Sequence, residues 1–264
     1  TTLNDGSIPN PVATPTVTTT YQVLVSSGSC KGTKNITVKV NPLPIVSVSS
    51  VEICEKEKVT LTASGASIYV WSGPGISPTT GGSITVNPTT TSTYSVVGTD
   101  INGCYSGATG TVTIKALPTI SMNSEEICSG VLVTLTATGG DTYTWTGSSG
   151  GALPAGPSIN VKPITTTTYT VTGIAANGCK GSAVGKVTVN PTPDVAVNSG
   201  VMCKGDNFTL KAVGASTTYS WQASDGSQMP NKDVVIVSPV SSTTYTVTGS
   251  AKGCSDTAIA HVNV

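Results

Sequence analysis

Apolar and polar residues alternate along most of this chain. Val59, Leu61 and Ala63, for example, are separated by threonines, and Ile84 and Val86 are separated in the same way. A period of two is typical of a strand that has one face in a dry core and the other in water. Gly, Pro, Asn and Ser stand between these short segments and favour turns. The pattern therefore predicts an all-β protein.

The alternating pattern itself repeats with a period of about 75 residues. Tyrosines recur in Thr-rich Tyr-x-Val frames, and tryptophans recur two places after another tyrosine. Each of these rings falls on the inward phase of its strand, so we predict core packing rather than a sugar-binding platform. The predicted core aromatics are Trp71, Trp145, Trp221, Tyr94, Tyr169 and Tyr245. Several short strands in each unit predict two antiparallel sheets packed face to face.

Proline-containing joints near Pro42, Pro118 and Pro191 divide the chain into four predicted parts. Proline keeps such joints extended and stiff, so we expect an elongated array. Three complete sandwich domains are predicted at residues 42–116, 117–190 and 191–264. Residues 1–41 match only the later strands of a repeat and are predicted to be a truncated half-repeat. Its apolar face needs cover, either from an upstream half or from another chain, which would permit self-association.

The cysteines follow the same repeat. In each complete repeat one cysteine precedes an apolar-Thr-Leu strand and a second follows the tyrosine strand. This spacing predicts one bond inside each repeat, and each bond would contribute roughly 4 kcal/mol in the chain-entropy model. The predicted disulfides are Cys54–Cys104, Cys128–Cys179 and Cys203–Cys254, and Cys30 is predicted to be unpaired. Persistent disulfides indicate an oxidising compartment, so we expect an extracellular or cell-surface protein.

The tryptophan strand followed by a tyrosine strand resembles the immunoglobulin superfamily. The motifs I-C-x4-V-T-L-T-A, Y-x-W, V-x-P-x-T-T-T-x-Y-x-V-x-G and N-G-C are similar to Ig-like repeats of large secreted and surface proteins of Bacteroidetes. The cysteines depart from the immunoglobulin pattern because they flank strands rather than occupy core positions. The resemblance implies a cell-adhesion or stalk role and names no ligand, since a widely shared fold does not fix function.

The charge of the chain and its lack of known catalytic motifs argue against several classes of function. Lys and Arg number 13, and so do Asp and Glu, which gives no reason to expect nucleic-acid binding. Apolar runs are too short for membrane insertion as a helix. No nucleophile elbow, phosphate-binding loop or paired carboxylates occur, so no enzyme activity, catalytic residue or cofactor is expected. No metal site is predicted either, although the carboxylates near Cys54 and Cys128 leave calcium at the joints an open question.

These observations predict a non-enzymatic adhesin or spacer region built from disulfide-stapled Ig-like repeats. The expected partner is an unidentified surface protein or polysaccharide. An ancillary carbohydrate- or protein-binding module of a secreted multidomain hydrolase is the alternative. An exposed aromatic platform would favour that alternative, and the loops after each tryptophan are where the repeats differ most.

Overall fold

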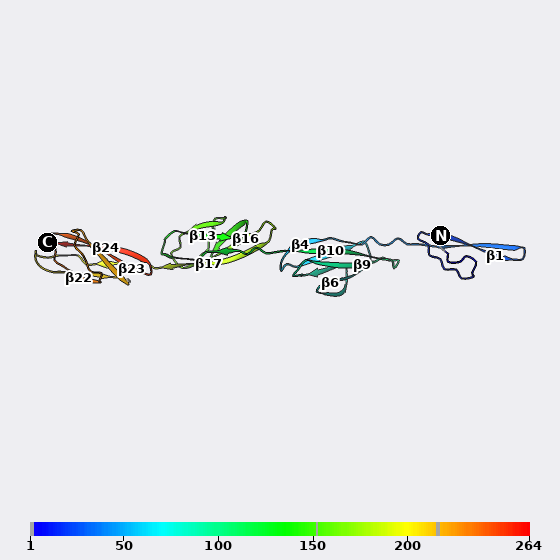
Figure 1. Cartoon of the computed structure of the whole chain (residues 1–264), viewed down its shortest axis with the longest axis horizontal. Helices are drawn as coiled ribbons and strands as arrows, with labels where there is room; N and C mark the ends of the chain where they lie inside the picture. Colours follow the sequence, from blue (N-terminus) through cyan, green and yellow to red (C-terminus); the bar gives the residue numbers. More distant parts are fainter. Residues whose placement is uncertain (1–2, 152, 215–216) are drawn as a thin grey trace. The chain divides into compact units, whose positions relative to one another are not determined.

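The computed structural model describes residues 3–151, 153–214 and 217–264 of the chain. Within these residues the regular structure consists of strands, which confirms the predicted all-β class. The chain forms two compact units, which are Thr1–Ala116 and Leu117–Val264. Thr1 and Thr2, at the start of the predicted half-repeat, lie outside the described residues. Figure 1 shows the strands in sequence order, coloured from blue to red.

The predicted half-repeat contains one antiparallel hairpin of β1 (Thr19–Ser27) and β2 (Cys30–Val38). An isolated bridge joins Leu3 to Ala13 in the segment before it. Both strands of the hairpin are largely exposed, because no second sheet covers them among the described residues.

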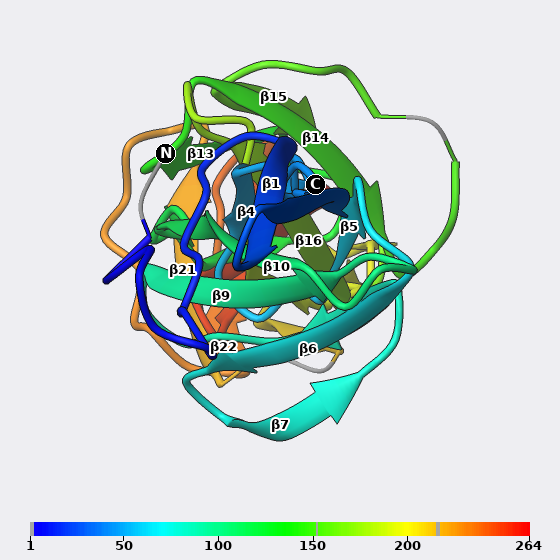
Figure 2. The ribbon, with the colours of Figure 1, turned by 90° about the vertical axis from the view of Figure 1, so that its right-hand side faces the viewer.

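The first complete repeat is a sandwich of a three-stranded sheet and a five-stranded sheet. The small sheet has the order β3-β5-β8 and the large sheet has the order β4-β10-β9-β6-β7. Figure 2 shows β9, β6 and β7 side by side in the large sheet. The bounds are β3 (Ser47–Val48), β4 (Val51–Cys54), β5 (Val59–Ser64), β6 (Ile68–Gly73), β7 (Ile76–Thr80), β8 (Ser83–Val86), β9 (Ser92–Thr99) and β10 (Tyr105–Lys115).

The second repeat has the same plan without a counterpart of β7. Its sheets have the orders β11-β13-β15 and β12-β17-β16-β14. The bounds are β11 (Ser121–Met122), β12 (Glu125–Cys128), β13 (Val133–Thr138), β14 (Thr142–Gly147), β15 (Ser158–Val161), β16 (Thr167–Ile174) and β17 (Lys180–Asn190).

The third repeat copies the second, with the orders β18-β20-β22 and β19-β24-β23-β21. The bounds are β18 (Ala196–Val197), β19 (Gly200–Val201), β20 (Phe208–Val213), β21 (Thr218–Ala223), β22 (Val234–Val237), β23 (Thr243–Ala251) and β24 (Cys254–Asn263). Recurrence of one strand order in three successive segments shows that the sequence period is a structural repeat.

The larger sheet of each repeat has one parallel pair at its edge. The pairs are β4 with β10, β12 with β17, and β19 with β24. All other strand pairs between the described strands are antiparallel, as the alternating pattern predicts. The parallel pair arises because the chain crosses to the larger sheet after the first strand of the small sheet, and the short strand that follows runs beside the last strand of the repeat in the same direction. This detail decides where the first cysteine of each repeat lies.

Each complete repeat buries a core of its own. A leucine that is at most 3% exposed lies in the centre of each small sheet, at Leu61, Leu135 and Leu210. The tryptophan of the facing sheet, the tyrosine of the next strand and valines of the last two strands pack in the same core. Three separate cores mean that each repeat has its own hydrophobic stabilisation.

Candidate functional site

The predicted core aromatics are buried, which confirms that part of the sequence interpretation. Trp71, Trp145 and Trp221 are between 0 and 8% exposed. Each indole Nε1 donates a hydrogen bond of 2.8 to 2.9 Å to a backbone carbonyl. The acceptors are Gly81, Gly156 and Lys232, which lie in the loop that follows each tryptophan strand. The tryptophans therefore fill the core and fix these loops, and they offer no open surface for a sugar ring.

The tyrosines of the Tyr-x-Val frames are also buried. Tyr94, Tyr169 and Tyr245 are at most 5% exposed. Burial raises the pKa of all three hydroxyls above the usual value near 10, because the phenolate would be poorly solvated. These hydroxyls are thus neutral structural groups at physiological pH.

A second set of tyrosines, two places before each tryptophan, fixes another loop. The hydroxyl of Tyr69 accepts a hydrogen bond from the Ala66 nitrogen and donates one to the Ala66 oxygen, both of 2.8 Å. Tyr143 makes the same two bonds with Gly140, at 2.8 and 2.7 Å. The sequence pattern placed these rings inside the sandwich, but it gave no signal for their loop partners.

The loops after the tryptophans differ between repeats, as the sequence suggested. In the first repeat the loop forms the extra strand β7, which pairs with β6. The corresponding loop of the second repeat includes Ala152, which lies outside the described residues. Tyr105, at 68% exposed, is the one large aromatic ring that is strongly exposed in the described parts of the chain. A single ring does not form an aromatic platform on these loops.

The predicted disulfides inside the repeats are wrong. The second repeat carries a bond between Cys128 and Cys254, whose Cα atoms lie 5.5 Å apart. This bond excludes both Cys128–Cys179 and Cys203–Cys254. Cys104 is a free cysteine, which excludes Cys54–Cys104.

The remaining cysteines complete this correction. Cys54 and Cys179 are disulfide-bonded in the structure. Cys203, predicted to be bonded, is a free and exposed cysteine. Cys30, predicted to be unpaired, is likewise free and exposed.

The parallel strand pair explains why a bond within one repeat cannot form. Cys128, at the end of β12, lies opposite Asn190, at the end of β17. Cys179 immediately precedes Lys180, the first residue of that same β17. The two cysteines are thus separated by the length of an 11-residue strand, about 35 Å. A disulfide requires Cα atoms within about 7 Å, so the second cysteine of the same repeat is out of reach.

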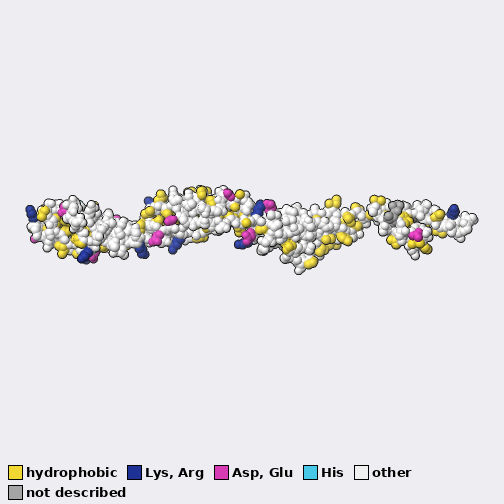
Figure 3. Space-filling view, viewed as in Figure 1, with side chains coloured by type: hydrophobic (Ala, Val, Ile, Leu, Met, Phe, Trp, Pro, Cys, Tyr) yellow, Lys and Arg dark blue, Asp and Glu magenta, His cyan; other side chains and the backbone are white. Residues whose placement is uncertain are grey.

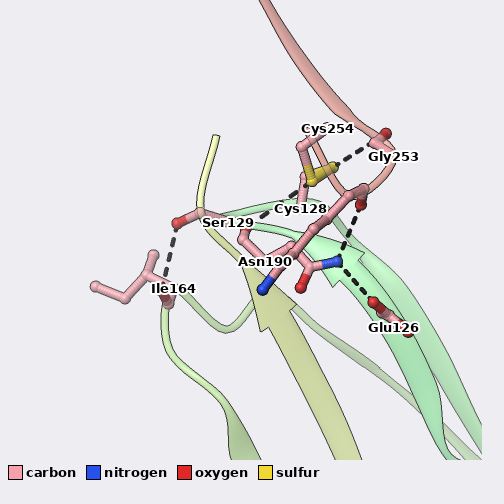
Figure 4. Close-up of a disulfide and its surroundings, with 8 residues drawn as sticks. Glu126, Cys128, Ser129, Ile164, Asn190, Gly253 and Cys254 are labelled. Carbon is pink, nitrogen blue, oxygen red and sulfur yellow. Dashed lines mark hydrogen bonds between the residues drawn. A yellow bond between two sulfur atoms is a disulfide. The ribbon is translucent and has the colours of Figure 1, made fainter. Parts of the chain in front are cut away.

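The observed bond joins two consecutive repeats of the second compact unit. Cys254 begins β24, directly after a tight turn in which Lys252 and Gly253 both have positive φ (51° and 77°). This hairpin end of the third repeat meets the end of β12 in the second repeat (Figure 4). The bond therefore spans 126 residues of sequence and crosses the joint at Pro191.

Asn190 lies beside the disulfide and connects the same two repeats. Its side chain is 7% exposed, and its Nδ2 donates to the Glu126 Oε1 at 2.7 Å and to the Lys252 oxygen at 3.0 Å. Its backbone oxygen accepts a hydrogen bond of 3.0 Å from the Ser129 nitrogen. Figure 4 shows the amide reaching toward both repeats. Because a buried amide needs partners, these bonds favour one arrangement of the joint.

The first complete repeat ends in an equivalent arrangement. Lys115 pairs with Cys54 as Asn190 pairs with Cys128, and its oxygen accepts a hydrogen bond from the Glu55 nitrogen at 2.9 Å. Its ammonium group lies 2.7 Å from the Glu52 carboxylate, which takes the place of the contact between Asn190 and Glu126. A polar side chain at this strand end thus contacts an acidic residue of the neighbouring short strand in both repeats.

The N-terminal hairpin of β1 and β2, in the predicted half-repeat, exposes an apolar surface. Val23, Val25 and Ile36 of its hairpin are 43 to 64% exposed. They line a groove of about 1040 Å³ together with Leu3 and Tyr21. The Tyr21 hydroxyl is buried beside this groove and has no hydrogen-bond partner among the described residues.

The described residues support neither a metal site nor a membrane-spanning helix. Figure 3 shows Lys and acidic side chains interspersed on the face drawn. Among residues 3–151, 153–214 and 217–264, no three His, Cys, Asp or Glu side chains gather in a way that would hold a metal ion. The same residues contain no helix of the length and apolarity needed to cross a bilayer.

Comparison with known proteins supports the architecture. Residues 116–193 match the family model described as an Ig-like domain, CHU_C associated. A protein of Ruminiclostridium cellulolyticum, described as uncharacterized, is 30% identical over 197 residues, which cover 71% of this chain and 54% of the relative. The chain therefore spans about half the length of that relative.

Several solved structures are similar to this chain at low sequence identity. The I-band fragment of titin is 12% identical, with a TM-score of 0.44, and the match covers 86% of this chain and 99% of the fragment. A structure of a 1.5-MDa bacterial ice-binding adhesin is 17% identical, with a TM-score of 0.32, and the match covers 85% of this chain and 100% of that chain. Similarity at this level carries no conclusion about function.

The family match over the second repeat and the common strand order of all three complete repeats define the class. The chain is a tandem array of Ig-like β-sandwich repeats.

Proposed function

We propose that this array is a non-enzymatic linking region of an extracytoplasmic adhesin-type protein. The observation that carries the proposal is the disulfide between Cys128 and Cys254, which joins one repeat to the next. A bond across a joint couples neighbouring domains covalently and restricts their separation under tension. Such a bond is useful in a region that must space or transmit force between other parts of a protein.

The same proposal includes the cellular location of the protein and its relationship to other repeat proteins. Disulfides persist outside the reducing cytosol, which supports a secreted or cell-surface location. The repeat motifs support a finer relationship to Ig-like repeats of large Bacteroidetes surface proteins. The partner is then a surface protein or polysaccharide, bound by this region or by domains that it spaces. The burial of the repeated aromatic residues in the cores supports a structural role.

Single-molecule extension of the full chain, held by its two ends, tests the linking role. The residues enclosed by the disulfide cannot extend while it is intact. Reduction should therefore lengthen the fully unfolded chain by at least about 420 Å, because each of the 126 enclosed residues adds about 3.3–3.6 Å of extended length. A Cys203→Ser variant, which removes a free thiol, should behave like the parent protein. Equal extension before and after reduction would refute a mechanical role for the bond.

The alternative is an ancillary carbohydrate-binding module. A polysaccharide pull-down with the oxidised protein separates the two roles. Saturable binding that depends on the loops after the tryptophans would favour the alternative. The linking role predicts no such binding, because the tryptophan rings are enclosed.

Self-association through the half-repeat is a separate proposal. The exposed groove beside Val23, Val25 and Ile36 is apolar, and burial of such surface favours association. Sedimentation analysis should show a concentration-dependent dimer that Val25→Lys weakens. A monomer at all concentrations would refute this proposal without affecting the linking role.

A further inference from the structure

We propose that β22 of the third repeat is a docking strand for a second copy of this chain. Two β22 strands pair edge to edge in antiparallel orientation, which joins the three-stranded sheets of two molecules into one sheet. The contact is independent of the linking role and of the half-repeat hairpin, because it uses neither the disulfide nor β1 and β2.

The outer face of the three-stranded sheet is polar in the first two complete repeats. Polar side chains pair across the strands of this face, Thr60 with Thr85 at 2.9 to 3.0 Å in the first repeat and Thr134 with Asn160 at 2.7 Å in the second. The edge strands β8 and β15 thus direct polar side chains outward and apolar ones into the core. A face of this kind is satisfied by its own hydrogen bonds and by water.

The third repeat carries apolar residues at the same positions. Ile236 of β22 occupies the place of Thr85 and Asn160, and Val234 occupies the place of a serine in both other repeats. Ile236 is 67% exposed and Val234 is 40% exposed. Val213 of the neighbouring strand β20 is also exposed, at 47%. The outer face of this sheet therefore presents an apolar strip that the other two repeats lack.

The apolar strip lies on a free sheet edge. β22 pairs with β20 on one side, and no strand of the described residues pairs with its other side. A free edge offers unpaired backbone N–H and C=O groups, and proteins protect such edges with charged residues, proline or a bulge. The four residues of β22 are all apolar, and their pairing with β20 is regular. Nothing within the strand itself therefore prevents another strand from pairing with it.

A second β22 fits this edge in a register that keeps the apolar side chains together. Residues directly opposite each other in an antiparallel pair point to the same face of the sheet. With Val235 opposite Val235 of the second copy, Val234 lies opposite Ile236 at both ends of the pair. Two apolar cross-strand pairs then cover the strip, and the same surface serves both molecules, as a two-fold contact requires.

The charges beside β22 also favour a second copy. In this register Lys232 lies opposite Ser238 and Asp233 lies opposite Val237, so no like charges meet. One basic and one acidic residue precede the strand, so it offers no net attraction to a partner strand of either charge. The chain has a formal net charge of zero, and long-range repulsion therefore does not oppose the approach of two copies.

The contact is small and therefore weak. A strand of four residues on each side buries less surface than the roughly 1,200–2,000 Å² of a stable interface. We expect association that depends on protein concentration rather than a permanent dimer.

Hydrogen–deuterium exchange on the full oxidised chain, at low and high protein concentration, tests where the contact forms. The amides of residues 234–237 should exchange at least about threefold more slowly at high concentration. Those of β15, the equivalent edge strand with a polar outer face, should exchange equally at both concentrations. Slower exchange confined to β1 and β2, or no change in β22, would overturn the proposal.

A matched pair of variants tests the apolar strip. Val234→Ser combined with Ile236→Thr gives β22 the outer face of β8. This double variant should raise the dissociation constant at least about fivefold in sedimentation analysis, through the lost cross-strand pairs. Ile259→Thr removes a similarly exposed isoleucine, at 58%, from the larger sheet and should leave the dissociation constant unchanged.

The measurements are made in a Val25→Lys background, so that the half-repeat hairpin does not contribute to association. Circular dichroism verifies that the variants, which change only exposed side chains, keep their fold. A dissociation constant that is equal in the double variant and its parent would refute the docking role of β22. The linking role would not be affected, because the disulfide lies outside this strand.

Discussion

Each tryptophan fills the core of its repeat and at the same time holds a loop through its indole nitrogen. The alternation of apolar and polar residues predicted that Trp71, Trp145 and Trp221 are buried, and the structure confirms it. It could not predict the acceptors, because they lie 10 or 11 residues further along in loops whose sequences differ. Burial follows from a local period, whereas a hydrogen-bond partner depends on how a particular loop turns back.

A glycine at the same place in each repeat allows two backbone segments to approach closely. Gly139 has a φ of +96°, and a Cβ there would collide with the carbonyl oxygen of Thr119. We predict that Gly139→Ala lowers the free energy of unfolding by at least about 2 kcal/mol, from backbone strain plus the collision. Thermal or chemical denaturation measures the change.

Gly151→Ala is the matched control for this substitution. Gly151 has nearly the same φ, +95°, but no atom of the described residues beyond its chain neighbours lies within 4 Å of the Cβ position. Gly151→Ala should therefore lower the free energy of unfolding only by the cost of placing alanine in the left-handed conformation. Equal destabilisation by both substitutions would contradict the role given to the close approach.

The buried tyrosines predict a loss of stability at high pH. Burial raises the pKa of Tyr94 in the folded protein, so the folded state binds more protons than the unfolded state above about pH 10. The stabilisation is fully present below the unfolded pKa and decreases as pH rises toward the folded pKa. Urea unfolding at pH 9 and pH 11 should show the decrease, and Tyr94→Phe should make it smaller. An unchanged pH dependence in this variant would contradict the assignment.

At the scale of strands, the period of two locates the elements well but does not specify how their ends meet. The alternating segments around Leu61, Leu135 and Leu210 became the central strands of the small sheets. The short strands β4, β12 and β19 are only two to four residues long, and their parallel pairing with the last strand has no signature in the sequence. For this reason the sequence did not show at which end of its repeat each first cysteine lies, and all three predicted disulfides were wrong.

The core of the second repeat can be tested with two leucines of neighbouring position. Leu135 on β13 is 0% exposed, and Leu132 just before that strand is 63% exposed. We predict that Leu135→Ala lowers the free energy of unfolding by about 2–5 kcal/mol, through lost burial and a cavity. Leu132→Ala should change it by no more than about 0.5 kcal/mol. Similar effects in both variants, measured by chemical denaturation, would be inconsistent with the proposed core face.

At the scale of the whole chain, the complete repeats are domains with separate cores, and the second and third repeats are joined by a disulfide as well as by the peptide chain. The sequence predicted the repeated sandwich because period and turn residues are local signals. It did not predict covalent coupling, since equal numbers of cysteines per repeat suit bonds within repeats and bonds between them equally well. Which bonds form is decided by strand register, which places the two cysteines of one repeat at opposite ends.

The disulfide should also restrain motion between the second and third repeats. Cys128→Ser combined with Cys254→Ser removes the bond and leaves no thiol at either position, while the hydrogen bonds of Asn190 remain. We predict a broader distribution of distances between spin labels at Lys162 and Lys211, introduced as cysteines in a background without free thiols and measured by pulsed electron resonance. An unchanged distribution would show that the polar contacts alone hold the joint.

Mapping of disulfide-linked peptides from the unreduced protein tests the central claim most directly. Trypsin alone is insufficient, because Cys128 and Cys179 both lie between Lys115 and Lys180, and Lys162 precedes a proline. Added chymotrypsin cleaves after aromatic residues and separates them. We predict a linked pair of peptides that contain Cys128 and Cys254. A linked pair containing Cys128 and Cys179 would contradict covalent coupling of consecutive repeats.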